Sequence, residues 1–162
     1  MKPATLFAIV LIATALGCNT QNPAVKLAPN ARIEIFSISG VSGDNTKETV
    51  NPYSGETIWL VQPPIITNID VDTVATIREN VRDEKGNPLQ GDKALQINLT
   101  PSGAAKLREA SKNLVGKQLA FVVNGMVFST PTITGPIDTS LVITGKEMDK
   151  ILPTLTGIPA SQ

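Results

Sequence analysis

The sequence predicts an α+β fold with a mostly antiparallel sheet and two helices, and three observations predict it. Short β-rich segments recur along the chain and are separated by turn residues. Asn124-Gly125 offers the two positive-φ positions of a two-residue hairpin, and Thr100-Pro101 opens a segment with helical periodicity. With 162 residues, 41% of them apolar, the chain can form one domain with a substantial core.

Strands and a long loop are expected in the first part of the domain. Residues 31–38 are β-rich and form the first expected strand, and residues 39–56 are polar and glycine-containing, which is typical of a loop. A strand at 57–62 ends at Pro63-Pro64, because neither proline can donate to a β-ladder.

The next segments are less uniform in pattern. Residues 67–70 indicate a short capped turn. Residues 73–82 fit both a strand and a helix, since apolar residues recur at both spacings. The strand is favoured, because a wide loop at 83–92 then leads into residues 94–99, where apolar and polar residues alternate as in a strand.

The strongest helix pattern follows Thr100, which is expected to accept hydrogen bonds from the first free amides as N-cap. Pro101 suits the first helical position, where no N–H is needed, and Gly116 is expected to end the helix as a left-handed cap. An apolar stripe runs along it, formed by Ala104, Leu107, Ala110 and Leu114.

The C-terminal part predicts a hairpin, a strand and a second helix. Strands at 118–123 and 126–130 flank Asn124-Gly125, and alternation on both faces predicts that the first of them is central. A further strand is expected at 140–145. A short helix begins near Thr144, with Glu147 completing a capping box and Pro153 limiting its length.

The N-terminus has the pattern of a bacterial lipoprotein signal. Lys2 precedes an apolar run at 4–16, which at about 13 residues is short of the roughly 20 that span a bilayer. Ala15-Leu16-Gly17-Cys18 resembles a lipobox, which implies cleavage after residue 17 and acylation of Cys18. A buried or chance cysteine is the alternative. The expected divisions are a signal peptide at 1–17, an acylated tether at 18–30, a domain at 31–158 and a tail at 159–162.

Composition excludes several classes of function. The 14 basic and 14 acidic residues balance without clustering, which argues against nucleic-acid binding. The chain has no histidine, so a Ser-His-Asp triad is excluded. Asp70 and Asp72 lack the rest of a calcium loop, and Gly116-Lys117 lacks the rest of a phosphate loop. The sequence therefore predicts no enzyme, no metal site and no cofactor.

The stretch "LTPSGAAKLREASKNLVGKQLAFVVNGMVFSTPTITGPI", followed by "ITG", resembles the head of the first periplasmic domain of SecD, part of the SecDF export machinery. The resemblance covers about residues 33–159 and departs from the family where Asn124 replaces the usual Asp of the turn. It implies a SecD-head-like domain without the family's membrane channel, so no proton-driven motor is expected. The matching residues are Thr100, Gly103, Ala104, Gly116, Lys117, Leu119, Ala120, Gly125, Pro131, Ile137, Ile143, Thr144 and Gly145.

These features together predict a non-enzymatic, extracytoplasmic lipoprotein, anchored through Cys18 in the cell membrane or the outer membrane. It is expected to bind polypeptide or an envelope protein, including translocon components, with a link to protein export. A structural or assembly lipoprotein of an unrelated envelope complex is the alternative, and a hydrolase is a third class. Tyr53, Trp59 and Asn124 are the candidate partner contacts, although packing within the sheet is the favoured interpretation of Trp59.

Overall fold

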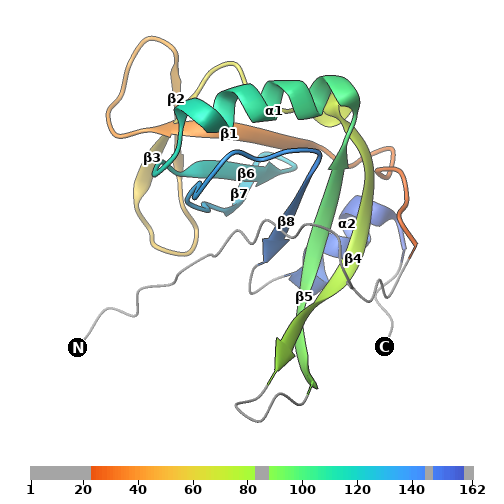
Figure 1. Ribbon diagram of the computed structural model, residues 1–162. Coiled ribbons are helices and arrows are strands. Elements are labelled where there is room, and N and C mark those ends of the chain that lie inside the picture. The colour runs from red at the N-terminus through yellow and green to blue at the C-terminus, as the bar shows by residue number, and fades with distance from the viewer. Residues whose placement is uncertain (1–22, 83–87, 145–147, 159–162) are drawn as a thin grey trace, which may run out of the picture.

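The protein is described by a computed structural model that covers residues 23–82, 88–144 and 148–158 (Figure 1). In chain order the elements are β1 (Ile33–Ser39), β2 (Thr46–Val50), β3 (Thr57–Val61), the 3₁₀-helix η1 (Asn68–Asp70), β4 (Val71–Arg82), β5 (Pro88–Leu99), α1 (Pro101–Asn113), β6 (Leu119–Val123), β7 (Met126–Ser129), β8 (Ser140–Thr144) and α2 (Met148–Thr156).

The strands form two antiparallel sheets, and with α1 and α2 they confirm the predicted α+β class. The larger sheet has the order β2-β3-β1-β6-β7 and the smaller has the order β4-β5-β8. A single sheet was expected. The strands divide because β4 and β5 pair with each other along most of their lengths, as the long hairpin in Figure 1, and only β8 joins them.

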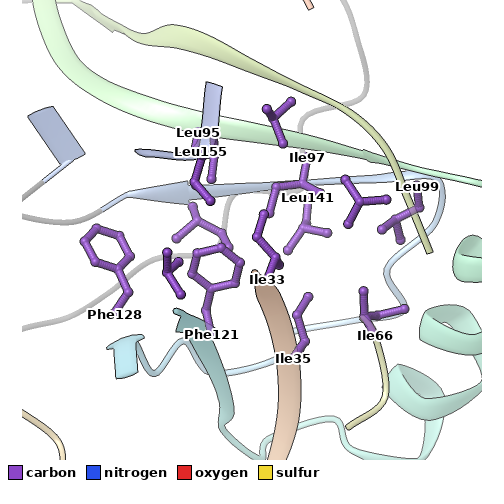
Figure 2. Close-up of a cluster of buried hydrophobic side chains, with 14 of the residues drawn as sticks. Ile33, Ile35, Ile66, Leu95, Ile97, Leu99, Phe121, Phe128, Leu141 and Leu155 are labelled. Carbon is purple, nitrogen blue, oxygen red and sulfur yellow. The ribbon is translucent and has the colours of Figure 1, made fainter. Parts of the chain in front are cut away.

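The main core fills the space between the two sheets and the helices. Ile33, Ile35 and Phe121 of the larger sheet face side chains of the smaller sheet and of α2, as Figure 2 shows. The fully buried members include Ile33, Ile66, Leu95, Ile97, Leu107 and Leu155. Aliphatic side chains thus supply most of this core.

A second, smaller cluster lies on the other face of the larger sheet. Phe36, Ala120, Val122 and Val127 pack there with Leu60 of β3. All five residues of β6 are buried, alternately in one cluster and the other, which confirms the prediction of a central strand covered on both sides.

Strand β1 is paired along both edges, partly by a side chain. It pairs with β6 on one side. On the other side its last residues pair with β3, and Ile35 exchanges backbone hydrogen bonds with residues 65–66. Before Ile35 no strand continues the ladder. Instead the Asn68 amide accepts from the Ile33 N–H at 2.7 Å and donates to the Ala31 carbonyl at 2.6 Å. This side chain completes the edge of β1, so its backbone groups are satisfied.

Three elements differ from their sequence-based expectations. β2 lies inside the expected loop 39–56, because an edge strand needs no continuous apolar face. β5 begins at Pro88, inside the expected loop 83–92. α2 continues through Pro153 to Thr156, held by buried Leu152 and Leu155, and Gly157 with φ 68° follows it. The expected capping residue Glu147 lies outside the described residues.

Residues 23–31, which we call the strap, are docked onto the domain where a flexible tether was expected to reach residue 30. Val25 and Val74 exchange two backbone hydrogen bonds of 2.8 Å. The Ala28 N–H donates to the carbonyl of Leu155 near the end of α2, also at 2.8 Å, and Lys26 forms an ion pair with Asp72. The strap therefore covers the start of the β4 edge and satisfies a terminal helix carbonyl.

The start of α1 is locked to η1 through Asp70. As predicted, Thr100 is the N-cap and accepts from the Gly103 N–H at 3.1 Å. The Asp70 carbonyl accepts from the Thr100 N–H at 2.9 Å, and the buried Asp70 carboxylate accepts from Lys106 at 2.7 Å and from the Thr67 N–H at 3.0 Å. The backbone carbonyl and the side-chain carboxylate of Asp70 therefore together hold the helix against the 3₁₀ turn.

Gly103→Ala should lower the free energy of unfolding by about 2 kcal/mol. In an open helix the same change would stabilise by about 1 kcal/mol. Here an added Cβ would lie 2.4 Å from the Asp70 carbonyl oxygen, so the helix or η1 must shift, which costs more than the propensity gain. Urea unfolding measures the difference. Gly40→Ala is the matched control, because its Cβ would meet nothing within 4 Å, and equal effects at both sites would contradict this packing.

Asp70→Asn should destabilise the domain by about 1–2 kcal/mol near neutral pH, and the effect should shrink in acid. Burial alone would raise the pKa of Asp70, but hydrogen bonds from Lys106 and Thr67 outweigh it and hold the pKa below the ordinary value of 3.8. The stability that the ionised carboxylate contributes is therefore fully present above about pH 4 and is lost as the pH falls through the lowered pKa. Unfolding curves between pH 7 and pH 2 test this. Asp44→Asn, at an exposed aspartate, is the control variant.

Candidate functional site

The β2–β3 hairpin forms one end of the larger sheet and carries two of the three nominated residues. Its loop is shaped by Asn51, whose side-chain oxygen accepts from the Tyr53 N–H at 3.0 Å, and by Gly55 with φ 72°. Asn51 also exchanges backbone bonds with the far side of the loop. The register pairs Glu48 with Trp59 and Val50 with Thr57.

Trp59 lies on the face of this hairpin that points away from the second buried cluster. Strand residues alternate between faces, and Ile58 and Leu60 on either side of Trp59 pack against the second buried cluster. Trp59 is partly buried and belongs to neither cluster of the core. It lies in a row across three strands, between Glu48 of β2 and Ser39 of β1. The chain's single tryptophan therefore lies on the same face of the larger sheet as Ile33 and Ile35 but outside the main core, and it is partly exposed.

The outer edge of β2 presents backbone groups that no described residue pairs. Two backbone hydrogen bonds at the ends of the hairpin show which residues of β2 bond to β3. The Gln62 N–H donates to the Asn45 carbonyl, and the Asn51 N–H donates to the Glu56 carbonyl. Since hydrogen-bonded and non-hydrogen-bonded pairs alternate in an antiparallel ladder, the N–H and C=O groups of Glu48 and Val50 point away from β3. These four groups are a template for a further strand. The sequence did not predict these groups, because the polar residues of β2 have the pattern of a loop.

Tyr53 anchors the hairpin loop to the rest of the sheet. Its ring meets the ring of Phe128 edge to face, with centroids 6.5 Å apart, and Phe128 meets Phe121 in the same way at 6.2 Å. The Asn51 side chain also reaches the Thr130 hydroxyl at 3.4 Å. Although 43% of Tyr53 is exposed, its packing shows a structural role beside any role in binding.

Asn124 lies at the opposite end of the larger sheet from Trp59. Its φ of 49°, with 82° at Gly125, confirms the predicted turn. Its side-chain oxygen accepts from the Arg32 N–H at 2.8 Å, before the start of β1, whereas Trp59 pairs with the last residue of β1. Seven strand residues separate the two sites by about 20 Å. The structure therefore does not bring the three nominated residues into one site.

An open groove of about 360 Å³ lies beside the start of β1, lined by residues of the strap, β1 and η1. Arg32 and Glu34 form an ion pair of 2.8 Å there, and Ile69 is 81% exposed at its rim. The pair neutralises the only charged side chains of the lining, so the groove offers no uncompensated charge to a ligand.

Other chemistry is sparse in the part of the chain that the structure describes. Residues 23–82, 88–144 and 148–158 contain no group of three or more potential metal-ligating His, Cys, Asp or Glu side chains. No helix among them is long and apolar enough to cross a membrane. Cys18, the predicted acylation site, lies outside the described residues.

Residues 50–151 match the family model "SecDF, P1 head subdomain". The chain belongs to this family. The match is shorter than the stretch 33–159 suggested by the resemblance, and β1 and the strap precede it. It includes Tyr53, Trp59 and Asn124.

Relatives of this P1 head domain are SecDF proteins. The "Protein translocase subunit SecDF" of Thermus thermophilus is 32% identical over 71 residues, which are 44% of this chain and 8% of that protein. A solved structure described as "Structure and function of a membrane component SecDF that enhances protein export" aligns with a TM-score of 0.52 and 21% identity, over 78% of this chain and 60% of that one. A crystal structure of SecDF in a super-membrane-facing form aligns with a TM-score of 0.48 and 22% identity, over 72% and 17% of the two chains. This chain thus shares the head fold and spans a small part of the translocase subunit.

Substitutions at Asn124 should separate backbone strain from hydrogen bonding. Asn124→Ala should lower the free energy of unfolding by about 2 kcal/mol, because alanine disfavours positive φ and loses the bond to Arg32. Asn124→Gly should lose only the bond, at about 1 kcal/mol, and Asn124→Asp should keep both features. Thermal or urea unfolding measures the series. If alanine is as stable as aspartate, the turn does not depend on this side chain.

Proposed function

We propose that this protein is an extracytoplasmic lipoprotein whose P1 head domain binds extended polypeptide and acts, without catalysis, in protein export. Membership of the SecDF P1 head family supports the connection with export, since the related proteins are described as a translocase subunit and as a membrane component that enhances protein export. Translocon components and chains in transit are the partners that this function implies.

The observation that carries the proposal is the open edge of β2 beside Trp59. Backbone groups of Glu48 and Val50 can pair with any extended chain, because main-chain hydrogen bonds do not depend on the side chains of the partner. Trp59, on the adjoining face, adds an amphipathic aromatic surface of the kind enriched in interfaces. A protein that meets many unfolded sequences needs this kind of backbone-directed recognition.

An acyl anchor on Cys18 would leave this edge accessible. Cys18 precedes Val25 by seven residues, which span at most about 25 Å when extended. Since Val25 is paired with β4, the anchor would hold the strap side of the domain near the membrane. Figure 1 shows the strap and the β2–β3 hairpin at opposite ends of the domain. Several acyl chains together would give stable attachment, because each buried methylene contributes about 0.8 kcal/mol.

Photo-crosslinking in cells that express the full chain tests the proposal. A photoreactive phenylalanine analogue at position 59 should form adducts with many different polypeptides or with translocon subunits, identified by mass spectrometry. The same analogue at the exposed position of Glu109 on α1 should form few of these adducts. A single recurrent folded partner at position 59 would instead support an assembly lipoprotein, and no site-specific adducts would contradict both functions.

The anchor has its own control in the same cells. Cys18→Ser removes the thiol that would be acylated, so the chain should lose its lipid label. The label decides the test, because an unprocessed apolar segment 4–16 could itself hold the variant at the membrane. A variant that keeps the lipid label would contradict acylation at Cys18.

A further inference from the structure

We infer that the β2 edge selects extended segments with a basic residue at the centre and apolar β-branched residues two positions to either side. This inference rests on the proposed function and names the class of polypeptide segment bound at that site. It follows from the phase of the ladder and from the charges of the hairpin.

The phase of β2 fixes which partner residue faces which side chain. The N–H and C=O of Glu48 point away from β3. An antiparallel strand added to β2 therefore places its central residue opposite Glu48, and the two residues exchange two backbone hydrogen bonds. Directly opposed residues place their side chains on the same face of a sheet. The central side chain of the partner therefore lies beside Glu48, on the face that carries Trp59.

The charge of the hairpin favours a cation. Within residues 39–61, all of them described, the charged side chains are three acids and one lysine: Asp44, Lys47, Glu48 and Glu56. None of the four forms an ion pair with another described residue. Glu48 is exposed and directly accessible from the edge, so a lysine or arginine opposite it gains a cross-strand ion pair.

The neighbours of Glu48 specify the flanking positions. Residues two positions to either side of the partner's centre lie opposite Val50 and Thr46, on the same face. Val50 is 54% exposed and Thr46 is partly buried, so β-branched partner residues can pack against both. Residues one position from the centre lie opposite Lys47 and Thr49 on the other face, where Lys47 disfavours a second cation.

Fluorescence of the purified full chain tests this selection, since Trp59 is its only tryptophan. The probes are seven-residue peptides of threonine, with valine two positions to either side of a central lysine or a central glutamate. The lysine peptide should change Trp59 emission in a saturable manner and bind about fivefold more tightly than the glutamate peptide. Glu48→Lys should reverse this preference. Glu109→Lys makes the same charge change on α1 and should leave the preference unaltered.

A backbone test separates strand addition from simple charge attraction. N-methylation of the central lysine removes the N–H that would donate to Glu48 and should abolish binding, whereas N-methylation one position away, where the N–H points to solvent, should have little effect. Val50→Pro should likewise weaken binding, because it removes an outward N–H that β3 does not use. Equal binding of the two methylated peptides would overturn strand addition.

The outcomes distinguish this inference from the proposed function. Binding that is saturable but shows no preference between lysine and glutamate, or no response to Glu48→Lys, overturns the selection and leaves polypeptide binding intact. Failure of every peptide to bind, together with an absence of crosslinks from position 59, overturns both.

Discussion

The pairing of backbone groups along strand edges is the constraint on which the rest of this structure depends. β1 contributes to both buried clusters, so its N–H and C=O groups cannot be left to water on either side. β6 satisfies one edge, and the other is completed by β3, by residues 65–66 and by the side chain of Asn68. Asn68 is held in place by η1, which Asp70 in turn locks to α1. The helix cap and the sheet edge are therefore one connected arrangement.

The same constraint separates the two ends of the domain. At one end the strap covers the start of β4 by pairing Val25 with Val74. At the other end β2 has no partner beyond β3 among the described residues, and its outward backbone groups lie beside Trp59. The proposed acyl anchor ahead of the strap and the open strand edge far from it would suit a domain that is held at a membrane and receives extended chains on its free side.

The features that depend on local chemistry could be predicted from the sequence. The N-cap at Thr100, the turn at Asn124-Gly125 and the central position of β6 each follow from a few neighbouring residues, and the structure confirms them. The elements that form only through contacts distant in the sequence could not be predicted. β2 is polar and becomes a strand only because β3 pairs with it, and the strap is ordered by β4 and α2. Trp59 could be nominated from its residue type, but the face of the sheet that it occupies depends on the register, and Glu48 and Val50 had no local signal at all.

Amide hydrogen exchange, read residue by residue along β2, tests the open edge most directly. Protection should alternate along the strand: the amides of Lys47 and Thr49, which bond to β3, should be protected, whereas those of Glu48 and Val50 should exchange orders of magnitude faster. Addition of an extended polypeptide that binds should slow exchange at Glu48 and Val50. Strong protection of these two amides in the free protein would mean that the edge is already occupied, and it would contradict the account.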